Sequence, residues 1–459
     1  MTRTATEGRL RIGTATGTDV RGDRGSSRAA RRSLVLDLFA GAGGLSLGFE
    51  QAGFDIAVAV ELDPIHLATH KLNFPYSLAI CADVRDLDGD GILDTLGVDE
   101  IDAVIGGPPC QGFSLIGHRV LGDPRNELVF HFLRLVKEIR PRVFVMENVP
   151  GMATGAHTEL LDELVAGFRA AGYEVRLPYR LLNAANYGIP QNRRRLVLLG
   201  ARSDTPLPAY PDATTRLRAN GGKGEREESG LVDLPYCPSV RDAIADLPDI
   251  EDYPELLESD ELRVALCGGS PYARTLRGER EDPADFGWSR ERDGRLLTGC
   301  LRARHTELSR RRFAETPPGA TEPVSRFYRL ALEGACNTLR AGTASDRGAF
   351  SAPRPIHPVY PRCISIREAA RLHSYPDWFR FHRTIWHGFR QIGNSVPPLL
   401  ARAIGQSVMT ALGASPKRPR AAVALGSDEL ASFDMRKAAA FFGVDPGVVP
   451  PRRRVAVAN

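Results

Sequence analysis

The chain has 459 residues, enough for about two or three domains, and its hydrophobic (42%) and charged (25%) fractions are ordinary for a globular protein. No apolar run approaches the roughly 20 residues that span a membrane, and the Arg-rich first residues lack the apolar core of a secretory signal. The seven cysteines are scattered without a C-x-x-C pair, which argues against a disulfide framework and a zinc site. We therefore expect a cytoplasmic protein that binds no metal. Its net charge of +4, with arginines gathered in the tails and the middle, permits a nucleic-acid partner.

Residues 1–32 hold hardly any large apolar side chain and are expected to form a disordered basic arm. From residue 33 to about 205, short apolar runs alternate with amphipathic stretches. The apolar runs predict strands at 33–39, 56–60, 77–81, 101–105, 143–146, 173–182 and 196–199. The amphipathic stretches predict helices at 45–51, 127–139 and 158–170. A strand, a glycine turn and a helix in this order are typical of the first unit of a doubly wound α/β sheet.

The glycine turn after the first predicted strand reads Ala40-Gly41-Ala42-Gly43-Gly44. It is not a G-x-G-x-x-G dinucleotide motif, because position 46 is serine. Such a turn suits a nucleoside that carries an amino acid, but it can also be a purely structural turn. Glu61 ends the second predicted strand and suits a ribose diol, and Asp83 follows the third and suits an adenine amino group. Either acid alone is more often a helix cap or a surface charge, but two acids at strand ends beside a glycine turn favour a nucleoside pocket.

Cys110 follows the fourth predicted strand in the sequence Gly107-Pro108-Pro109-Cys110. The prolines fix the direction of the chain, although a lone cysteine is commonly a buried structural residue. Glu147 follows the fifth predicted strand. Because the carboxyl ends of parallel strands share one edge of the sheet, these groups and the glycine turn are expected to lie together as a ligand site.

A run of arginines lies in Gln191-Asn192-Arg193-Arg194-Arg195, just before a predicted strand. Extended backbone alternates its faces, so Arg193 and Arg195 are expected on one face and Arg194 on the other. The pair suits recognition of an anion or a base carbonyl, and the alternative is a solvated edge. From about 206 to 350 the chain is irregular, and arginines such as Arg302, Arg304 and Arg310 suit contact with phosphates. Order returns with a helix at 365–372 behind a Ser-x-x-Glu capping box and a last helix at 399–412.

Taken in order, these motifs resemble those of the C5-cytosine DNA methyltransferases, of the bacterial restriction–modification or Dcm-like type. The matching stretches are Asp37–Gly44, Gly107–Gln111, Glu147–Val149, Gln191–Arg195, Arg367–Leu372 and Gly393–Val396. One departure is His373-Ser374-Tyr375-Pro376, where the family often has Gln-Gly-Phe-Pro. The resemblance implies a Rossmann-like S-adenosylmethionine-dependent methyltransferase domain with a smaller, loop-rich target-recognition domain. We divide the chain into an arm (1–32), a catalytic and cofactor-binding domain (33–205), the target-recognition domain (206–350), the C-terminal part of the catalytic domain (351–412) and a tail (413–459), in which a short helix near 428–442 is expected.

The implied reaction transfers the methyl group of S-adenosyl-L-methionine to carbon 5 of a flipped-out cytosine in a specific duplex sequence, leaving S-adenosyl-L-homocysteine. Cys110 would add to carbon 6 of the base, and Glu147 would act as the acid at N3. Arg195, supported by Arg193, would hold the base carbonyl. The cofactor residues carried over from the family are Phe39, Ala40, Gly41, Gly43, Gly44, Leu45, Glu61, Leu62, Asp83, Val84, Pro108, Asn394 and Ser395. The DNA-binding candidates are Gln111, Ser114, Arg119, Thr338, Leu339 and Arg340.

The expected partner is double-stranded DNA, with a cognate restriction endonuclease for the same site as a further candidate. We expect a monomer that associates with the bacterial nucleoid. Two alternatives remain: a tRNA cytosine-5 methyltransferase of the same fold, and an inactive DNA-binding regulator. The intact Cys110, Glu147 and Arg195 speak against the regulator.

Overall fold

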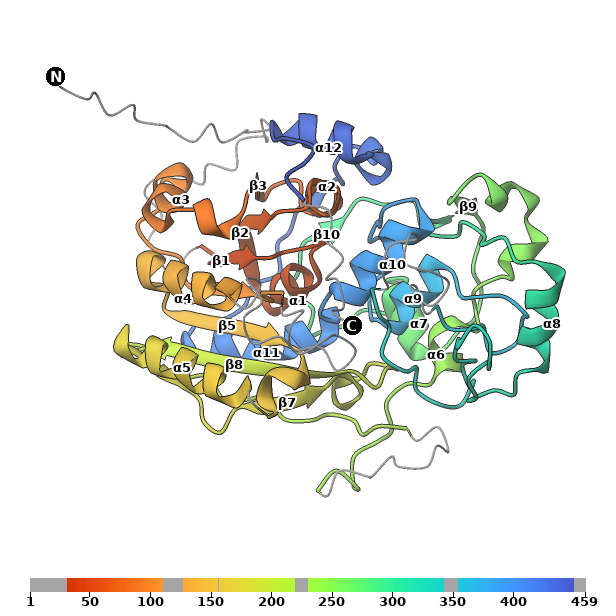
Figure 1. The fold of residues 1–459 in the computed structure, drawn as a ribbon, viewed down its shortest axis with the longest axis horizontal. Coiled ribbons are helices and arrows are strands. Elements are labelled where there is room, and N and C mark those ends of the chain that lie inside the picture. Colours follow the sequence, from red (N-terminus) through yellow and green to blue (C-terminus); the bar gives the residue numbers. More distant parts are fainter. Residues whose placement is uncertain (1–30, 110–126, 156, 219–229, 342–353, 450–459) are drawn as a thin grey trace, which may run out of the picture.

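The structure is a computed structural model that describes residues 31–109, 127–155, 157–218, 230–341 and 354–449 (Figure 1). Most of the predicted basic arm therefore lies outside the described residues. The prediction of disorder is wrong at its last residue, because the guanidinium of Arg32 donates to the Asp55 carboxylate at 2.8 Å and to the Phe54 carbonyl at 2.7 Å. Within the described residues, no helix is long and apolar enough to cross a membrane.

Among the described residues, eight strands form one sheet in the order β3-β2-β1-β4-β5-β8-β6, and β7 pairs with β8. The strands are β1 (Ser33–Leu38), β2 (Phe54–Glu61), β3 (Leu78–Cys81), β4 (Ala103–Gly106), β5 (Val143–Asn148), β6 (Tyr173–Val175), β7 (Arg180–Asn183) and β8 (Arg194–Arg202). The first five run parallel, and β8 runs antiparallel to β5. This confirms the predicted doubly wound α/β fold. The expected single strand at 173–182 is instead two strands, since Pro178 between them has no amide proton to donate to a ladder.

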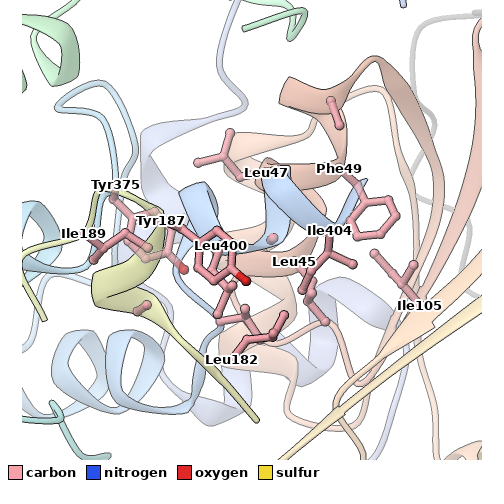
Figure 2. Close-up of a cluster of buried hydrophobic side chains, with 14 of the residues drawn as sticks. Leu45, Leu47, Phe49, Ile105, Leu182, Tyr187, Ile189, Tyr375, Leu400 and Ile404 are labelled. Atoms are coloured by element: carbon pink, nitrogen blue, oxygen red, sulfur yellow. The ribbon is translucent and has the colours of Figure 1, made fainter. Parts of the chain in front are cut away.

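Helices cover both faces of this sheet. The helices of the larger fold are α1 (Gly44–Ala52), α2 (Pro64–Asn73), α3 (Gly89–Leu96), α4 (Leu128–Ile139), α5 (His157–Ala170) and α11 (Pro398–Ala411). Side chains of α1 and α11 share one buried cluster with the sheet (Figure 2), and those of α3, α4 and α5 share another on the opposite face. A Cβ at Gly48 of α1 would lie 2.3 Å from the Cβ of Ala401 of α11. Glycine at that position therefore lets the end of the chain pack against its beginning.

A second group of elements lies beside the sheet (Figure 1). It contains α6 (Val240–Ile244), α7 (Pro271–Leu276), α8 (Glu307–Glu315), α9 (Ile366–Leu372) and α10 (Ile385–Asn394), with the short strands β9 (Leu262–Arg263) and β11 (Leu296–Leu297). The short strand β10 (Ser289–Arg290) lies closer to α2. Helix α9 begins at the predicted capping box, in which Ser365 and Glu368 each bond the other's backbone amide.

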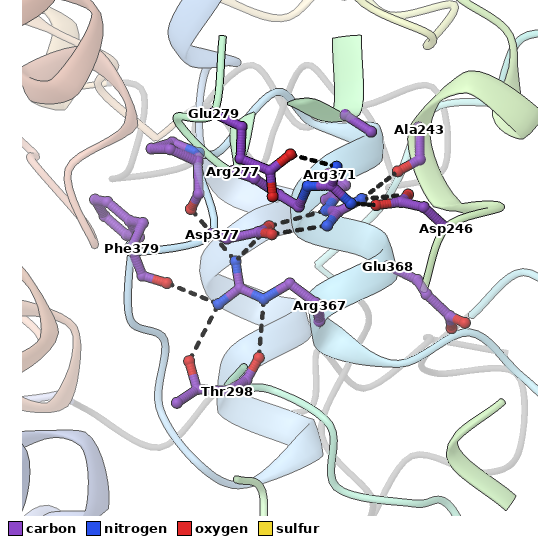
Figure 3. A network of polar contacts seen from close by, with 12 residues as sticks. Ala243, Asp246, Arg277, Glu279, Thr298, Arg367, Glu368, Arg371, Asp377 and Phe379 are labelled. Carbon is purple, nitrogen blue, oxygen red and sulfur yellow. Dashed lines mark hydrogen bonds and ion pairs between the residues drawn. The ribbon is translucent and has the colours of Figure 1, made fainter. Parts of the chain in front are cut away.

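Buried arginines of α9 attach it to the middle of the chain (Figure 3). Arg371 donates to Asp377 at 2.7 Å and to Asp246 at 2.6 Å, and Arg367 donates to the carbonyl of Thr298 at 2.9 Å. The two arginines are no more than 1% exposed. Helix α9, which the sequence division placed with the catalytic domain, is thus bonded to residues of the region 206–350.

The described part of the predicted tail is packed against the sheet domain. A 3-10 turn at Asp428–Ser432 and helix α12 (Met435–Phe442) confirm the expected short helix. Phe442 and Leu430 share a buried cluster with Leu67 and Leu72 of α2. Strand β12 (Ala422–Val423) also pairs with β10 of the middle region, so this segment joins the two parts of the fold.

Candidate active site

The glycine turn lies at the carboxyl end of β1 and is anchored by the acid at the end of β2. Gly41 (φ +56°) and Gly43 (φ +102°) adopt left-handed conformations that favour glycine. The amides of Gly41 and Asp63 each donate to a different oxygen of the Glu61 carboxylate at 2.9 Å. A Cβ at Gly41 would meet nothing within 4 Å, whereas one at Gly43 would lie 2.5 Å from the Phe74 ring. The turn is therefore closed on its inner side and open at Gly41, where a ligand can approach the backbone.

Asp83 follows β3 and caps a short 3-10 helix (Val84–Asp86). Its carboxylate accepts from the Arg85 amide at 3.0 Å and forms an ion pair with the Arg85 guanidinium at 2.7 Å. The capping role that the sequence left open is thus present. The other residues predicted around this pocket lie at the same strand ends: Phe39 and Ala40 follow β1, Leu45 lies in the first turn of α1, Leu62 follows β2, and Val84 follows Asp83.

Glu147 and Arg195 form an ion pair at the neighbouring strand ends. Because β5 and β8 are antiparallel, the last residues of β5 lie beside the first residues of β8. The Arg195 Nε lies 2.8 Å from the Glu147 Oε1, and the two side chains are 12% and 11% exposed. Burial raises the pKa of Glu147, and the charges of Arg195 and Arg193 oppose this shift. The net result is a pKa above the ordinary value for a glutamate side chain.

The loop that leads from β4 to Cys110 begins against this pair. A Cβ at Gly107 would lie 2.9 Å from the Glu147 Oε2, and the Asn148 side-chain amide donates to the Pro108 carbonyl at 3.3 Å. Glycine at 107 therefore allows the carboxyl to lie against the loop backbone. The predicted residues Cys110, Gln111, Ser114 and Arg119 lie outside the described residues.

Arg193 lies behind the pair and is 1% exposed. Its guanidinium donates to three backbone carbonyls, those of Leu339 (2.8 Å), Gly393 (2.9 Å) and Ser395 (2.8 Å). Arg194 is exposed, in agreement with the predicted alternation. Arg193 therefore has a different function from Arg195: it holds together segments from three parts of the chain.

Comparison with known proteins identifies the family of this chain. A model of the C-5 cytosine-specific DNA methylases matches residues 34–410. The chain belongs to this family. It is 55% identical to the type II methyltransferase M.XorII of Xanthomonas oryzae over 92% of this chain and 95% of that one. It is 33% identical to the type II methyltransferase M.AgeI of Thalassovita gelatinovora over 82% and 99% of the two chains.

Among solved structures, the chain resembles a DNA modification methyltransferase encoded within an Escherichia coli prophage. The TM-score is 0.65 with 34% identity, over 83% of this chain and 99% of that one. The predicted family and enzyme class are thus confirmed. The chain is a DNA cytosine methyltransferase, and its relatives are type II methyltransferases of restriction–modification systems.

In this methylase the late segments return to the glycine turn. A Cβ at Gly44 would lie 2.8 Å from the Ser395 Cβ and 2.4 Å from the Val396 carbonyl oxygen. Ser395 is thus adjacent to the start of α1, whereas the side chain of Asn394 is exposed.

The predicted DNA-binding residues 338–340 lie against the Gln191–Arg195 segment. The Thr338 hydroxyl donates to the Asn192 carbonyl at 2.7 Å, and Leu339 is 2% exposed. Of the three, only Arg340 has an exposed side chain. The Leu339 side chain lies in the core beneath the surface, and the expected DNA contact at this residue stays a prediction.

Sequence reasoning also missed a polar cluster behind the glycine turn. The Ser46 hydroxyl donates to Asp37 at 2.6 Å and lies 3.0 Å from the His70 Nε2, and Asp37 and His70 are fully buried. Burial raises the pKa of Asp37 to about 7 and lowers that of His70 to about 3. Ser46, which appeared only as a break in the dinucleotide pattern, is the residue that joins the other two.

Several arginines of the middle region form ion pairs with acidic residues of the same chain. Arg310 donates to Glu251 at 2.7 Å, Arg302 lies 3.8 Å from the same carboxylate, and Arg304 pairs with Glu258 at 2.8 Å. These three side chains have acidic partners within the chain, so the phosphate contacts expected of them would have to compete with those pairs.

Proposed function

We propose that this methylase modifies carbon 5 of a flipped-out cytosine through a covalent adduct with Cys110. The observation that carries the proposal is the Glu147–Arg195 pair, which lies against the loop that leads directly into Cys110. The proposal also rests on the family membership and on the order of the motifs.

S-adenosylmethionine is the methyl donor we propose, and when bound it supplies the methyl group as an electrophile. The residues at the glycine turn fit such a molecule. Gly41 leaves open space at the carboxyl ends of the strands, and acids stand at the ends of the next two strands, Glu61 for the ribose and Asp83 for the adenine. Ser395 borders the same turn from the late part of the chain.

The protein's own groups make the ring reactive. The Cys110 thiolate adds to carbon 6 of cytosine, so that a sulfur–carbon bond forms and the electron pair of the 5,6 double bond moves into the ring. A proton from Glu147 to N3 neutralises the ring and leaves an enamine whose carbon 5 is nucleophilic. The pKa of Glu147 is shifted upward by burial, which is the direction that favours this carboxyl as a proton donor. After methylation, N3 returns its proton to Glu147 and a base takes the proton from carbon 5. The bond between carbon 6 and sulfur then breaks, so that Cys110 leaves as a thiolate and the ring is aromatic again.

Arg195 positions Glu147 and, with its guanidinium, the carbonyl at position 2 of the base. The region 206–350 is proposed to read the target sequence, with Arg340 as an exposed candidate for a phosphate contact. We propose that the methylase acts on cellular DNA in the cytoplasm, as a monomer and alongside an endonuclease of the same specificity. Its type II methyltransferase relatives support the restriction–modification context.

The experiment is base-resolution methylation sequencing of DNA from cells that express the wild-type chain or the Cys110→Ala variant. We expect 5-methylcytosine at one discrete motif with the wild type and none with the variant. Methylation that persists in the variant would contradict the nucleophile. An unmethylated genome, together with methylated tRNA, would move the substrate to RNA.

A further inference from the structure

Three segments far apart in the sequence meet beneath the candidate active site: 191–193, 336–341 and 393–396. Asn192 donates its amide to the Cys336 carbonyl at 2.8 Å. A Cβ at Gly393 would lie 2.2 Å from the amide nitrogen of Ala341. The first segment belongs to the Arg195 side of the site, the second carries the predicted DNA contacts, and the third borders the cofactor turn.

Leu339 is bonded through both ends of its backbone. Its amide donates to the Gln191 Oε1 at 3.2 Å, and its carbonyl accepts from the Arg193 guanidinium at 2.8 Å. The same guanidinium donates to the Ser395 carbonyl at 2.8 Å. One connection between the DNA side and the cofactor side therefore runs through Arg193.

A second connection runs through His373, which is fully buried. Its Nδ1 lies 3.0 Å from the Gln191 Nε2, and its Nε2 lies 3.2 Å from the Ser395 carbonyl oxygen. Because Gln191 accepts from Leu339 through its oxygen, its amide nitrogen is the donor to Nδ1. A carbonyl only accepts, so the His373 Nε2 carries the proton.

The five groups thus form a closed ring of hydrogen bonds: Leu339, Gln191, His373, Ser395 and Arg193. The direction of the hydrogen bonds is fixed at His373, because its Nδ1 must accept from Gln191 and its Nε2 must donate to the Ser395 carbonyl. Burial lowers the pKa of His373, which keeps the imidazole in the neutral form that this polarity requires.

We propose that His373 is a positioning residue of the methylase that couples binding of the methyl donor beside Ser395 to binding of DNA beside Leu339. This inference rests on the proposed function. When DNA contacts the segment 338–340, the ring transmits a shift of that backbone to the backbone at 395. The reverse holds with equal strength, because coupling between two binding sites is reciprocal.

Glutamine is a matched substitution for testing the hydrogen-bond function of His373. A glutamine side chain also offers one acceptor and one donor, so it can accept from Gln191 and donate to the Ser395 carbonyl. Methionine has a similar length and neither strong group. The two substitutions therefore separate the hydrogen-bond function from the space that the side chain fills.

The experiment measures the dissociation constant of S-adenosylhomocysteine by calorimetry, with and without a duplex that carries the motif found by methylation sequencing. The full-length wild type, His373→Gln and His373→Met are compared, with thermal denaturation as the check on folding. We expect DNA to tighten S-adenosylhomocysteine binding of the wild type by roughly tenfold. His373→Gln is expected to keep this factor within twofold, and His373→Met to reduce it to less than threefold.

Gln191→Met breaks the same ring at the preceding bond and tests the inference if His373→Met does not fold. Its coupling should fall in the same way. A full coupling factor in the folded methionine variants, or a glutamine variant as uncoupled as the methionine one, would overturn the role of His373 while wild-type methylation stands. A wild type that binds S-adenosylhomocysteine and methylates no DNA would instead overturn the proposed function.

Discussion

Arg290 offers a quantitative test of how the middle region is fixed to the cofactor domain. It lies in β10 and forms an ion pair at 2.8 Å with Glu50 of α1, and the two side chains are 0% and 1% exposed. The guanidinium also donates to the Asn73 carbonyl, and its carbon lies 4.7 Å from the centre of the Trp378 ring. The ion pair is therefore shielded from solvent, and its groups also contact other residues from distant parts of the chain.

Replacement of Arg290 by methionine leaves the Glu50 charge buried without its cation. Removing one partner of a buried ion pair costs about 3–5 kcal/mol, whereas removing both can be nearly neutral. We therefore expect Arg290→Met to lower the free energy of unfolding by about 3–5 kcal/mol. The double variant Glu50→Gln/Arg290→Met should recover most of that loss, because no buried charge remains.

Urea denaturation followed by fluorescence and circular dichroism measures both variants against the wild type. Glu50→Gln alone is the matched control, since it removes the charge and leaves the arginine. A single arginine variant that costs less than about 1 kcal/mol, or a double variant no more stable than the single one, would refute the argument that an unpaired buried carboxylate dominates the cost.

Four further predictions concern single residues. Glu147→Gln should lower the single-turnover rate of methylation by about 10²–10⁴-fold while the affinity for S-adenosylhomocysteine changes little; an unchanged rate would remove Glu147 as the acid. Gly393→Ala should cost about 1–3 kcal/mol in denaturant unfolding, because the new methyl group would overlap the Ala341 backbone; a neutral effect would show that this junction gives way. The Asp37 pKa of about 7 means that the folded chain binds one more proton than the unfolded chain between about pH 4 and 7, so this contribution to stability falls as pH rises. Asp37→Asn should therefore flatten the dependence of the unfolding free energy on pH by up to about 1.4 kcal/mol per pH unit. Denaturant unfolding at pH 5 and 8 measures this change. Phe442→Ala should cost about 3–5 kcal/mol by the same measurement, and a loss below 1 kcal/mol would mean that α12 contributes little to the fold.

The parts of the site that the sequence could predict are those with local signals. The glycine turn, the acids at the strand ends and the Ser365 capping box each occupy a few consecutive residues, and the parallel sheet brings the strand ends to one edge. The alternation of Arg193 and Arg194 is equally local, since it follows from extended backbone.

The parts that could not be predicted depend on partners far away in the chain. His373 contacts a residue 182 positions earlier, and nothing in either neighbourhood signals the other. In the sequence, Ser46 only interrupts the dinucleotide-binding motif, and the fold alone places it beside Asp37 and His70. Composition showed the arginines of the middle region, but only the structure shows that Glu251 and Glu258 already hold three of them.

The same long-range contacts determine which part of the middle region, proposed to read the target sequence, can be exchanged without loss of the fold. Tyr210 belongs to the main core and donates its hydroxyl to the Val197 carbonyl at 2.8 Å, and Asp246 holds Arg371 of α9 at 2.6 Å. A replacement of all of 206–350 would remove both and leave Arg371 with one carboxylate partner. An exchange that starts beyond Asp246 and stops before Cys336 keeps Tyr210, Asp246 and the ring around His373. Within that stretch it must still retain Thr298, which accepts from Arg367, Arg290, which pairs with Glu50, and the core residue Leu330. The residues proposed to read DNA therefore have to be exchanged around these attachment residues.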